Sequence, residues 1–172
     1  MLRKMVRDFA INEVRPISPI IDKESKFPDE NIKKMAELGL MGIPWDQKYS
    51  GTGMDIRALV IAIEEIGKEC ASTAATMMAH TSLGTAPIAI FGNDEQKEKY
   101  LPLLSTGKII GAFGLTEPEA GSDAGNTQTK AIKHNDEYII NGQKVFCTNA
   151  GKAGTIIITA SIEEDGDDKG IG

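Results

Sequence analysis

The sequence has little cysteine and histidine, no basic excess and no long apolar run, and each absence removes a class of protein. Cys70 and Cys147 are its two cysteines; they lack metal-ligand spacing and fall in different regions, so we expect free thiols, no metal site and a reducing cytoplasm. The net charge is -6, which argues against a nucleic-acid-binding surface. No apolar run approaches the roughly 20 residues that a membrane-spanning helix needs, so we expect no membrane association.

The composition that remains is typical of a globular protein. Of 172 residues, 41% are hydrophobic and 26% are charged. This length suits one ordinary domain or two small ones, and it is sufficient to bury a core.

The first 108 residues have the apolar spacing of helices. Leu2, Met5, Val6 and Phe9 follow the i, i+3, i+4, i+7 rule, and we expect Pro16 and Pro19 to end that helix. Further helices are expected over residues 32–38, 56–70, 71–80, 88–91 and 95–104, with Gly84 and Pro87 as breaks and Asn93 or Asp94 as a cap. The pattern predicts a helical bundle.

Beyond residue 108 the pattern becomes that of strands. Short segments rich in Thr, Ile, Val and Phe lie at 127–132, 137–140, 144–148 and 155–160. Asn141-Gly142 between two of them predicts a hairpin turn, and the acidic residues 163–168 predict a solvated loop. The expected fold class is therefore α+β, an all-α bundle followed by an antiparallel β-domain.

The junction of the two parts is the segment 111–123, GAFGLTEPEAGSD. Its glycines allow close approach to a ligand, and the hydroxyls of Thr116 and Ser122 can donate and accept hydrogen bonds. The segment lacks the lysine of a P-loop and does not lead from a strand into a helix, so a phosphate cradle is disfavoured. We expect a bound group here.

Both ends of the chain interrupt a pattern. The first helix begins in mid-pattern without a cap, and the few strands expected would leave an unpaired sheet edge. We expect that the sequence is truncated at both ends.

The helices, the strands and the junction together resemble the acyl-CoA dehydrogenase family over essentially the whole chain. Two motifs carry the resemblance, GAFGLTEPEAGSD at 111–123 and DEYIINGQKVFCTNAGKA at 136–153. The resemblance implies an N-terminal helical domain at 1–108 and part of the middle β-domain at 109–172. Family members continue into a C-terminal helical domain, which is absent here.

The resemblance also implies a reaction. FAD would accept a hydride from an acyl-CoA thioester while a base removes the α-proton, giving trans-2-enoyl-CoA and passing electrons to an electron-transfer flavoprotein. A short-chain branch such as butyryl-CoA dehydrogenase and a homotetramer are expected. The family's base is a glutamate of the C-terminal domain, so no catalytic residue is expected in this chain, and we predict that the chain alone is colourless and inactive.

The implied cofactor-binding residues come from both motifs. Thr116 would bind the pyrimidine end of the flavin, Phe146 would lie against the ring, and Thr148 would bind beside flavin N5, with Cys147 contributing its backbone. Ser122 would contact the CoA part of the substrate. The full cofactor-binding set is Phe113, Gly114, Leu115, Thr116, Gly121, Ser122, Phe146, Cys147 and Thr148.

Three further residues have expected roles other than binding the flavin, and other functions of the chain remain open. Glu117 is expected to support the loop rather than act as a base, and Asn126 departs from the small residue that the family prefers there. His80 is expected to be a packed residue or to border the substrate cavity, where residues 77–83 would wall the acyl tail. An acyl-CoA oxidase, a decarboxylating relative and a non-catalytic binding module remain alternatives.

Overall fold

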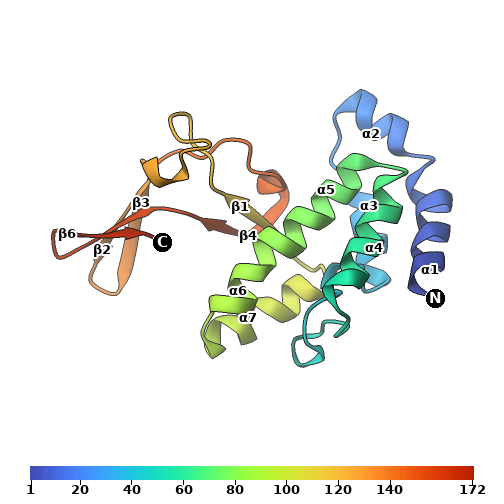
Figure 1. Ribbon diagram of the computed structural model, residues 1–172, viewed down its shortest axis with the longest axis horizontal. Coiled ribbons are helices and arrows are strands. Elements are labelled where there is room, and N and C mark those ends of the chain that lie inside the picture. Colours follow the sequence, from blue (N-terminus) through green and yellow to red (C-terminus); the bar gives the residue numbers. More distant parts are fainter.

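The chain forms seven α-helices followed by six strands, as the α+β pattern predicts. The structure is a computed structural model and describes residues 1–172. The helices are α1 (Leu2–Phe9), α2 (Ser18–Glu24), α3 (Asp29–Glu37), α4 (Ile56–Gly67), α5 (Ala71–Met78), α6 (Ala86–Phe91) and α7 (Asp94–Ser105). The strands are β1 (Ile110–Gly114), β2 (Lys130–His134), β3 (Glu137–Asn141), β4 (Ala153–Ile158), β5 (Ser161–Glu164) and β6 (Asp167–Ile171). Figure 1 shows an elongated molecule with the N-terminal helices at one end and β2, β3 and β6 at the other.

The apolar core lies among the helices. A cluster of 17 buried residues joins α1, α3, α4 and α5 and takes in Ile110 at the start of β1. Val6, Met35, Ile66 and Met77 have no exposed surface. These residues occupy the apolar stripes of their helices, so the helical spacing in the sequence identifies the core.

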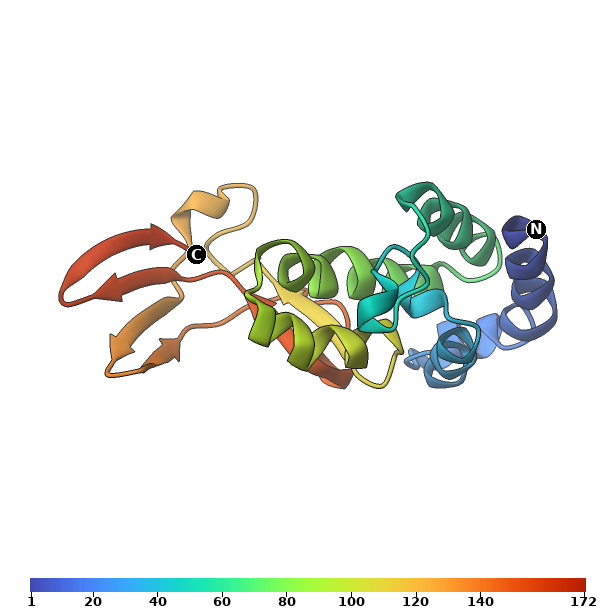
Figure 2. The ribbon, with the colours of Figure 1, turned by 90° about the horizontal axis from the view of Figure 1, so that it is seen from below.

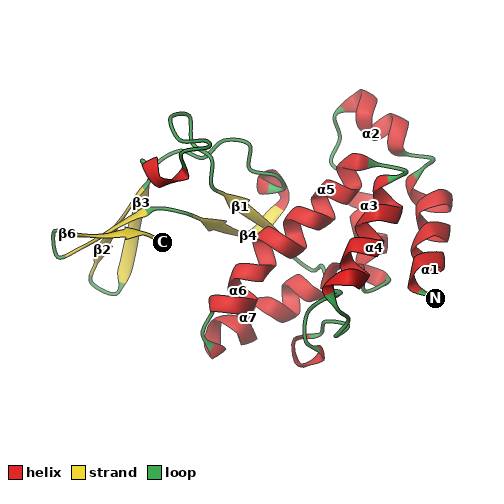
Figure 3. Cartoon of the chain, in the orientation of Figure 1, coloured by secondary structure: helices red, strands yellow, loops and turns green.

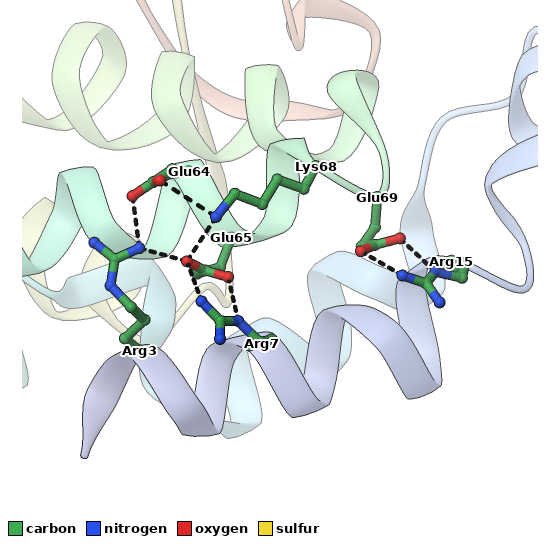
Figure 4. Close-up of polar contacts among 7 residues, drawn as sticks. All are labelled: Arg3, Arg7, Arg15, Glu64, Glu65, Lys68 and Glu69. Atoms are coloured by element: carbon green, nitrogen blue, oxygen red, sulfur yellow. Dashed lines mark hydrogen bonds and ion pairs between the residues drawn. The ribbon is translucent and has the colours of Figure 1, made fainter.

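A network of ion pairs fastens α1 to α4 beside this core (Figure 4). The Glu65 carboxylate is 1% exposed and accepts from Arg7 Nε at 2.9 Å, from Lys68 Nζ at 2.9 Å and from Arg3. Arg7 and then Lys68 hold the pKa of Glu65 well below its usual range. One turn away, Arg15 Nη2 donates to Glu69 Oε1 at 2.8 Å.

Pro19 lies where a helix begins rather than where one ends. The first helix continues through a π-helical turn, Ala10–Val14, before Pro16, as expected. Pro19, however, lies in the first turn of α2, which the sequence pattern did not predict. A proline is tolerated at that position because the first N–H groups of a helix have no intrahelical partner.

The expected break at Gly84 and Pro87 is also wrong. α5 passes into a π-helix, Ala79–Thr85, and then into α6 as one column, with Pro87 in the first turn of α6 (Figure 1). Asn93 caps α7 in a capping box with Gln96, as predicted. No helix is both long and apolar enough to cross a membrane.

The strands form two small sheets, and their pairing is mixed rather than antiparallel. β1 pairs with β4 in parallel, and a second sheet has the order β3-β2-β5-β6, in which β2 and β5 are parallel. The reason is topological: β1 leads to β2 and β4 leads to β5, so the two chain segments pass from one sheet to the other in the same direction. Figure 3 marks the strands in yellow, and Figure 2 shows the second sheet projecting from the helices.

The hairpin predicted at Asn141-Gly142 does not form, because residues 144–148 form no strand. β2 and β3 turn at Asn135-Asp136, between the strands expected at 127–132 and 137–140. A Cβ at Gly142 would lie 2.2 Å from Thr129 Oγ1, so this glycine serves a close contact and not a turn. The acidic segment expected as a loop is the β5–β6 hairpin, with its turn at Asp165-Gly166, both at positive φ.

Candidate functional site

The structure brings the two predicted cofactor-binding segments together. Residues 113–116 leave the end of β1, and residues 144–148 run beside them as an irregular segment. Three contacts join the segments: Val145 N donates to Thr116 O at 2.8 Å, Lys144 Nζ to Leu115 O at 3.0 Å, and Cys147 Sγ to Phe113 O at 3.2 Å. The Cys147 thiol therefore joins the segments, whereas we expected only its backbone to contribute.

Gly114 is the residue that permits this approach. A Cβ there would lie 3.1 Å from Lys144 Cγ and 3.3 Å from Ile158 Cγ2, tighter than ordinary contacts. The absence of a side chain lets the Lys144 stem cross the end of β1.

The surface formed by these segments carries an exposed aromatic ring. Phe146 is 92% exposed, and its backbone has φ of 56°, a region that costs a bulky residue about 1–3 kcal/mol. Thr148 is exposed as well, and Leu115 is 37% exposed. A strained, solvent-facing phenylalanine is unfavourable for a free chain and suits a surface that receives a ligand.

The same surface carries backbone donors without partners. The N–H groups of Leu115, Thr116, Phe146, Cys147 and Thr148 donate to no acceptor within the chain. The hydroxyls of Thr116 and Thr148 also make no hydrogen bond. At this exposed surface water can meet these donors in the free chain, and their concentration beside the Phe146 ring fits a polar planar ligand that accepts hydrogen bonds.

Gly121 and Ser122 lie farther along the loop after β1. Both are exposed; no atom would lie within 4 Å of a Cβ at Gly121. The Ser122 hydroxyl makes no hydrogen bond within the chain, so it is free for a ligand. The expected roles of these two residues stay predictions.

Glu117 holds the base of this loop. Its carboxylate accepts from Gln128 N at 2.6 Å, from Thr129 N at 3.0 Å and from Lys144 Nζ at 2.7 Å. These hydrogen bonds, that from Lys144 above all, lower the pKa of Glu117 to about 2. A buried carboxylate with these partners stays ionised and hydrogen-bonded, so the supporting role expected for it agrees with the geometry.

Two further residues contact Gly111 in β1, beside the site. His80 was expected to be packed or to border the substrate cavity, and its burial agrees with packing, but its partners were not predicted; Asn149 was not identified from the sequence. His80 is fully buried in the π-helix, where its Nδ1 accepts from Gly111 N at 2.9 Å and its Nε2 lies 3.2 Å from Leu104 O. Asn149 directly follows Thr148, and its Nδ2 donates to Thr76 O at 3.0 Å and to Gly111 O at 3.2 Å. The second motif contains Asn149, but a sequence motif does not show which backbone groups an amide contacts.

A cavity of about 400 Å³ opens beside the second segment. Its wall includes Thr148, Asn149 and Thr76, with Phe27 and Pro28, which directly precede α3. Asn149 is 7% exposed, and its Oδ1 has no partner in the chain. An unpartnered buried acceptor is costly, so a donor from water or a ligand is expected here.

Comparison with known proteins accounts for both parts of the chain. Residues 1–108 match the model of the acyl-CoA dehydrogenase N-terminal domain, and residues 112–172 match that of the acyl-CoA dehydrogenase middle domain. The short-chain specific acyl-CoA dehydrogenase of Clostridium acetobutylicum is 48% identical over 171 residues, which are 99% of this chain and 45% of that protein.

Two solved structures are similar in fold. Butyryl-CoA dehydrogenase from Megasphaera elsdenii has a TM-score of 0.89 at 39% identity, covering 93% of this chain and 43% of that one. An acyl-CoA dehydrogenase from Bacillus anthracis in complex with FAD has a TM-score of 0.88 at 37% identity, covering 94% and 29%.

The chain spans less than half the length of each of these proteins. Its whole length is nevertheless accounted for by the two domain models, apart from residues 109–111 between them. The agreement of two consecutive domain models, a close relative and solved folds shows that this chain belongs to the acyl-CoA dehydrogenase family.

Proposed function

We propose that this chain supplies one side of the FAD and acyl-CoA site of a short-chain acyl-CoA dehydrogenase. The reaction would convert an acyl-CoA such as butyryl-CoA to its trans-2-enoyl-CoA. The division into a helical domain at 1–108 and a β-domain at 109–172 is part of this proposal. One observation carries it: residues 113–116 and 146–148 meet in a surface of unpartnered donors around an exposed aromatic ring.

The residues of this surface fit a flavin. Phe146 offers an apolar face for the ring system, and the N–H and hydroxyl groups of Thr116 and Thr148 offer donors for its polar edge. Phe113, Gly114, Leu115, Gly121 and Cys147 would form the backbone wall around them. FAD supplies hydride acceptance when bound. The donors of this chain would stabilise the negative charge that arrives with the hydride.

Substrate positioning falls to other residues of the same loop. Ser122 would bind the CoA part of the thioester with its free hydroxyl, and residues 77–83 would wall the acyl tail. The short-chain preference is supported by the name of the Clostridium acetobutylicum relative. Holding the thioester in one orientation contributes to the rate without any chemical step by these residues.

We propose that the acceptor of the α-proton comes from residues outside this chain. Glu117 is the buried carboxylate nearest to the loop, and its pKa of about 2 and its three donors make it a poor base. We propose that a glutamate of a C-terminal domain serves in the complete protein. We also propose an electron-transfer flavoprotein as the electron acceptor, a homotetramer as the assembly and the cytoplasm as the location, where Cys70 and Cys147 stay reduced.

The test is an assay of the protein translated from the complete reading frame that contains these residues. With butyryl-CoA and FAD, the product should be the trans-2-enoyl-CoA, and the electrons should reduce an electron-transfer flavoprotein under anaerobic conditions. Hydrogen peroxide formed from oxygen would instead identify an oxidase, and carbon dioxide formed from a dicarboxylic acyl-CoA would identify a decarboxylating relative. FAD binding without turnover of any acyl-CoA would identify a binding module.

A matched pair of variants tests the flavin surface in the same protein. Phe146→Ala should raise the FAD dissociation constant about tenfold, because it removes roughly 1–1.5 kcal/mol of ring contact. Phe91→Ala is the control, since Phe91 is 84% exposed on α6 and outside the proposed site. Equal FAD affinity in the two variants would contradict the assignment.

A further inference from the structure

Both backbone polar groups of Gly111 are held by buried side chains. Its N–H donates to His80 Nδ1 at 2.9 Å, and its carbonyl accepts from Asn149 Nδ2 at 3.2 Å. His80 has no exposed surface and Asn149 is 7% exposed. We call these three residues the Gly111 clamp.

The Gly111 clamp also reaches two helices. Because His80 Nδ1 accepts a hydrogen bond, its proton lies on Nε2, which donates to Leu104 O in α7 at 3.2 Å. Asn149 Nδ2 donates a second hydrogen bond to Thr76 O in α5 at 3.0 Å. The clamp therefore fixes β1 against the helices through two buried side chains.

Gly111 lies where the pairing of β1 is irregular and its packing against the π-helix is close. Gly111 pairs with Thr155 in β4, and the register of this pairing shifts between Ile110 and Gly111, so the ladder is irregular directly before Gly111. The backbone of Gly84 packs directly on it: a Cβ at Gly84 would lie 2.4 Å from the Gly111 carbonyl carbon.

The residues of the Gly111 clamp are close in sequence to both segments of the site. Gly111 precedes Phe113 by two residues in the same strand, and Asn149 directly follows Thr148. A movement of the Gly111–Asn149 contact would therefore alter the spacing between residues 113–116 and residues 146–148.

We propose that His80 and Asn149 are positioning residues, which set the spacing between the two segments that form the flavin surface. Neither residue needs to touch the cofactor. The consequence for flavin binding rests on the proposed function, whereas the consequence for the spacing of the segments does not.

The test measures amide hydrogen exchange in the 172-residue chain. The Val145 N–H donates to Thr116 O and so reports the contact between the segments directly. Asn149→Asp keeps the side-chain shape but turns an oxygen toward two carbonyls, so Val145 protection should fall about tenfold relative to the amides of α4. Asn135→Asp is the matched control, because Asn135 is exposed and also has positive φ.

A second pair of variants separates positioning from general destabilisation. His80→Leu removes the acceptor for Gly111 N–H, and His80→Asn restores an acceptor close to the Nδ1 position. Val145 protection, again relative to α4, should fall in His80→Leu and recover in His80→Asn. Equal protection in these two variants, or an unchanged value in Asn149→Asp, would overturn the proposal.

FAD binding by the complete protein separates the positioning role of Asn149 from the proposed function. In the complete protein, Asn149→Asp should raise the FAD dissociation constant about tenfold while Asn135→Asp leaves it unchanged. Failure of the unaltered protein to bind FAD would refute the proposed function and leave the exchange result standing. An unaltered FAD affinity in Asn149→Asp, with Val145 protection lost, would overturn the link between the spacing and the cofactor.

Discussion

Among single residues, His80 has the environment with the clearest physical consequence. Burial lowers the pKa of its imidazole to about 4 from the usual 6.5, although a hydrogen bond to Leu104 O partly opposes the shift. The folded chain therefore holds His80 neutral, whereas the unfolded chain binds a proton below pH 6.5. The stability contributed by His80 is present above pH 6.5 and is lost as the pH falls toward 4.

This linkage predicts how the free energy of unfolding depends on pH. Between pH 6.5 and pH 5 the difference in protonation should remove about 2 kcal/mol of stability from the unaltered chain, at 1.36 kcal/mol for each pH unit. His80→Asn has no titrating group at this position and should lack that loss. Urea unfolding at pH 7 and pH 5 measures both. Parallel losses in the two proteins would show that His80 does not titrate as stated.

The site residues that lie in the two motifs could be predicted from the sequence. Contacts between side chains and backbone groups distant in the sequence could not. The segments at 113–116 and 146–148 and the supporting role of Glu117 follow from the motifs, and the structure places the segments in contact. Asn149 and the contacts of His80 were not predicted, because the partners of both side chains are backbone groups 24 to 73 residues away. A backbone carbonyl has no signature in the sequence.

Among the secondary-structure elements, helices were more predictable than strands for a physical reason. The apolar stripes of α1, α4 and α5 face one core, so their spacing reports their burial. The strands of the second sheet have few buried residues, with Ala131 in β2 as the main exception. Without a buried face their register is weakly specified, and Asn141-Gly142 suggested a second hairpin that does not form, since residues 144–148 form no strand.

The packing of the π-helix on β1 predicts the effect of one methyl group. Gly84→Ala would place a Cβ 2.4 Å from the Gly111 carbonyl carbon and 2.7 Å from Ala112 N, so the strand must move. We expect a loss of about 2 kcal/mol from overpacking, larger than the roughly 1 kcal/mol by which alanine favours a helix. Thermal unfolding checks this.

Gly151→Ala is the control for that substitution. No atom lies within 4 Å of a Cβ at Gly151, so its stability should stay within about 0.5 kcal/mol of the unaltered chain. A Gly84→Ala chain as stable as Gly151→Ala would mean that β1 and the π-helix are not in the close contact described.

In the molecule as a whole, the candidate site lies where the helical part meets the strands. The helices hold the apolar core and the ion pairs of α1 and α4, and the second sheet projects away from them (Figures 1 and 2). β1 and β4 lie between these parts; residues 113–116 include the end of β1, and residues 146–148 precede the turn Ala150–Lys152 that leads into β4. The order of helices and strands was predictable from the change of pattern near residue 108, but the parallel pairing was not, because it depends on two distant crossovers.

Nuclear magnetic resonance can show whether residues 113–116 and 146–148 form one flavin surface. FAD is titrated to millimolar concentration into the ¹⁵N-labelled 172-residue chain, so that even weak binding is detected. We predict that the amide signals of Leu115, Thr116, Phe146, Cys147 and Thr148 shift together and with one dissociation constant, because these N–H groups have no partner in the chain. Unmoved signals at these five residues, with or without shifts elsewhere, would contradict it.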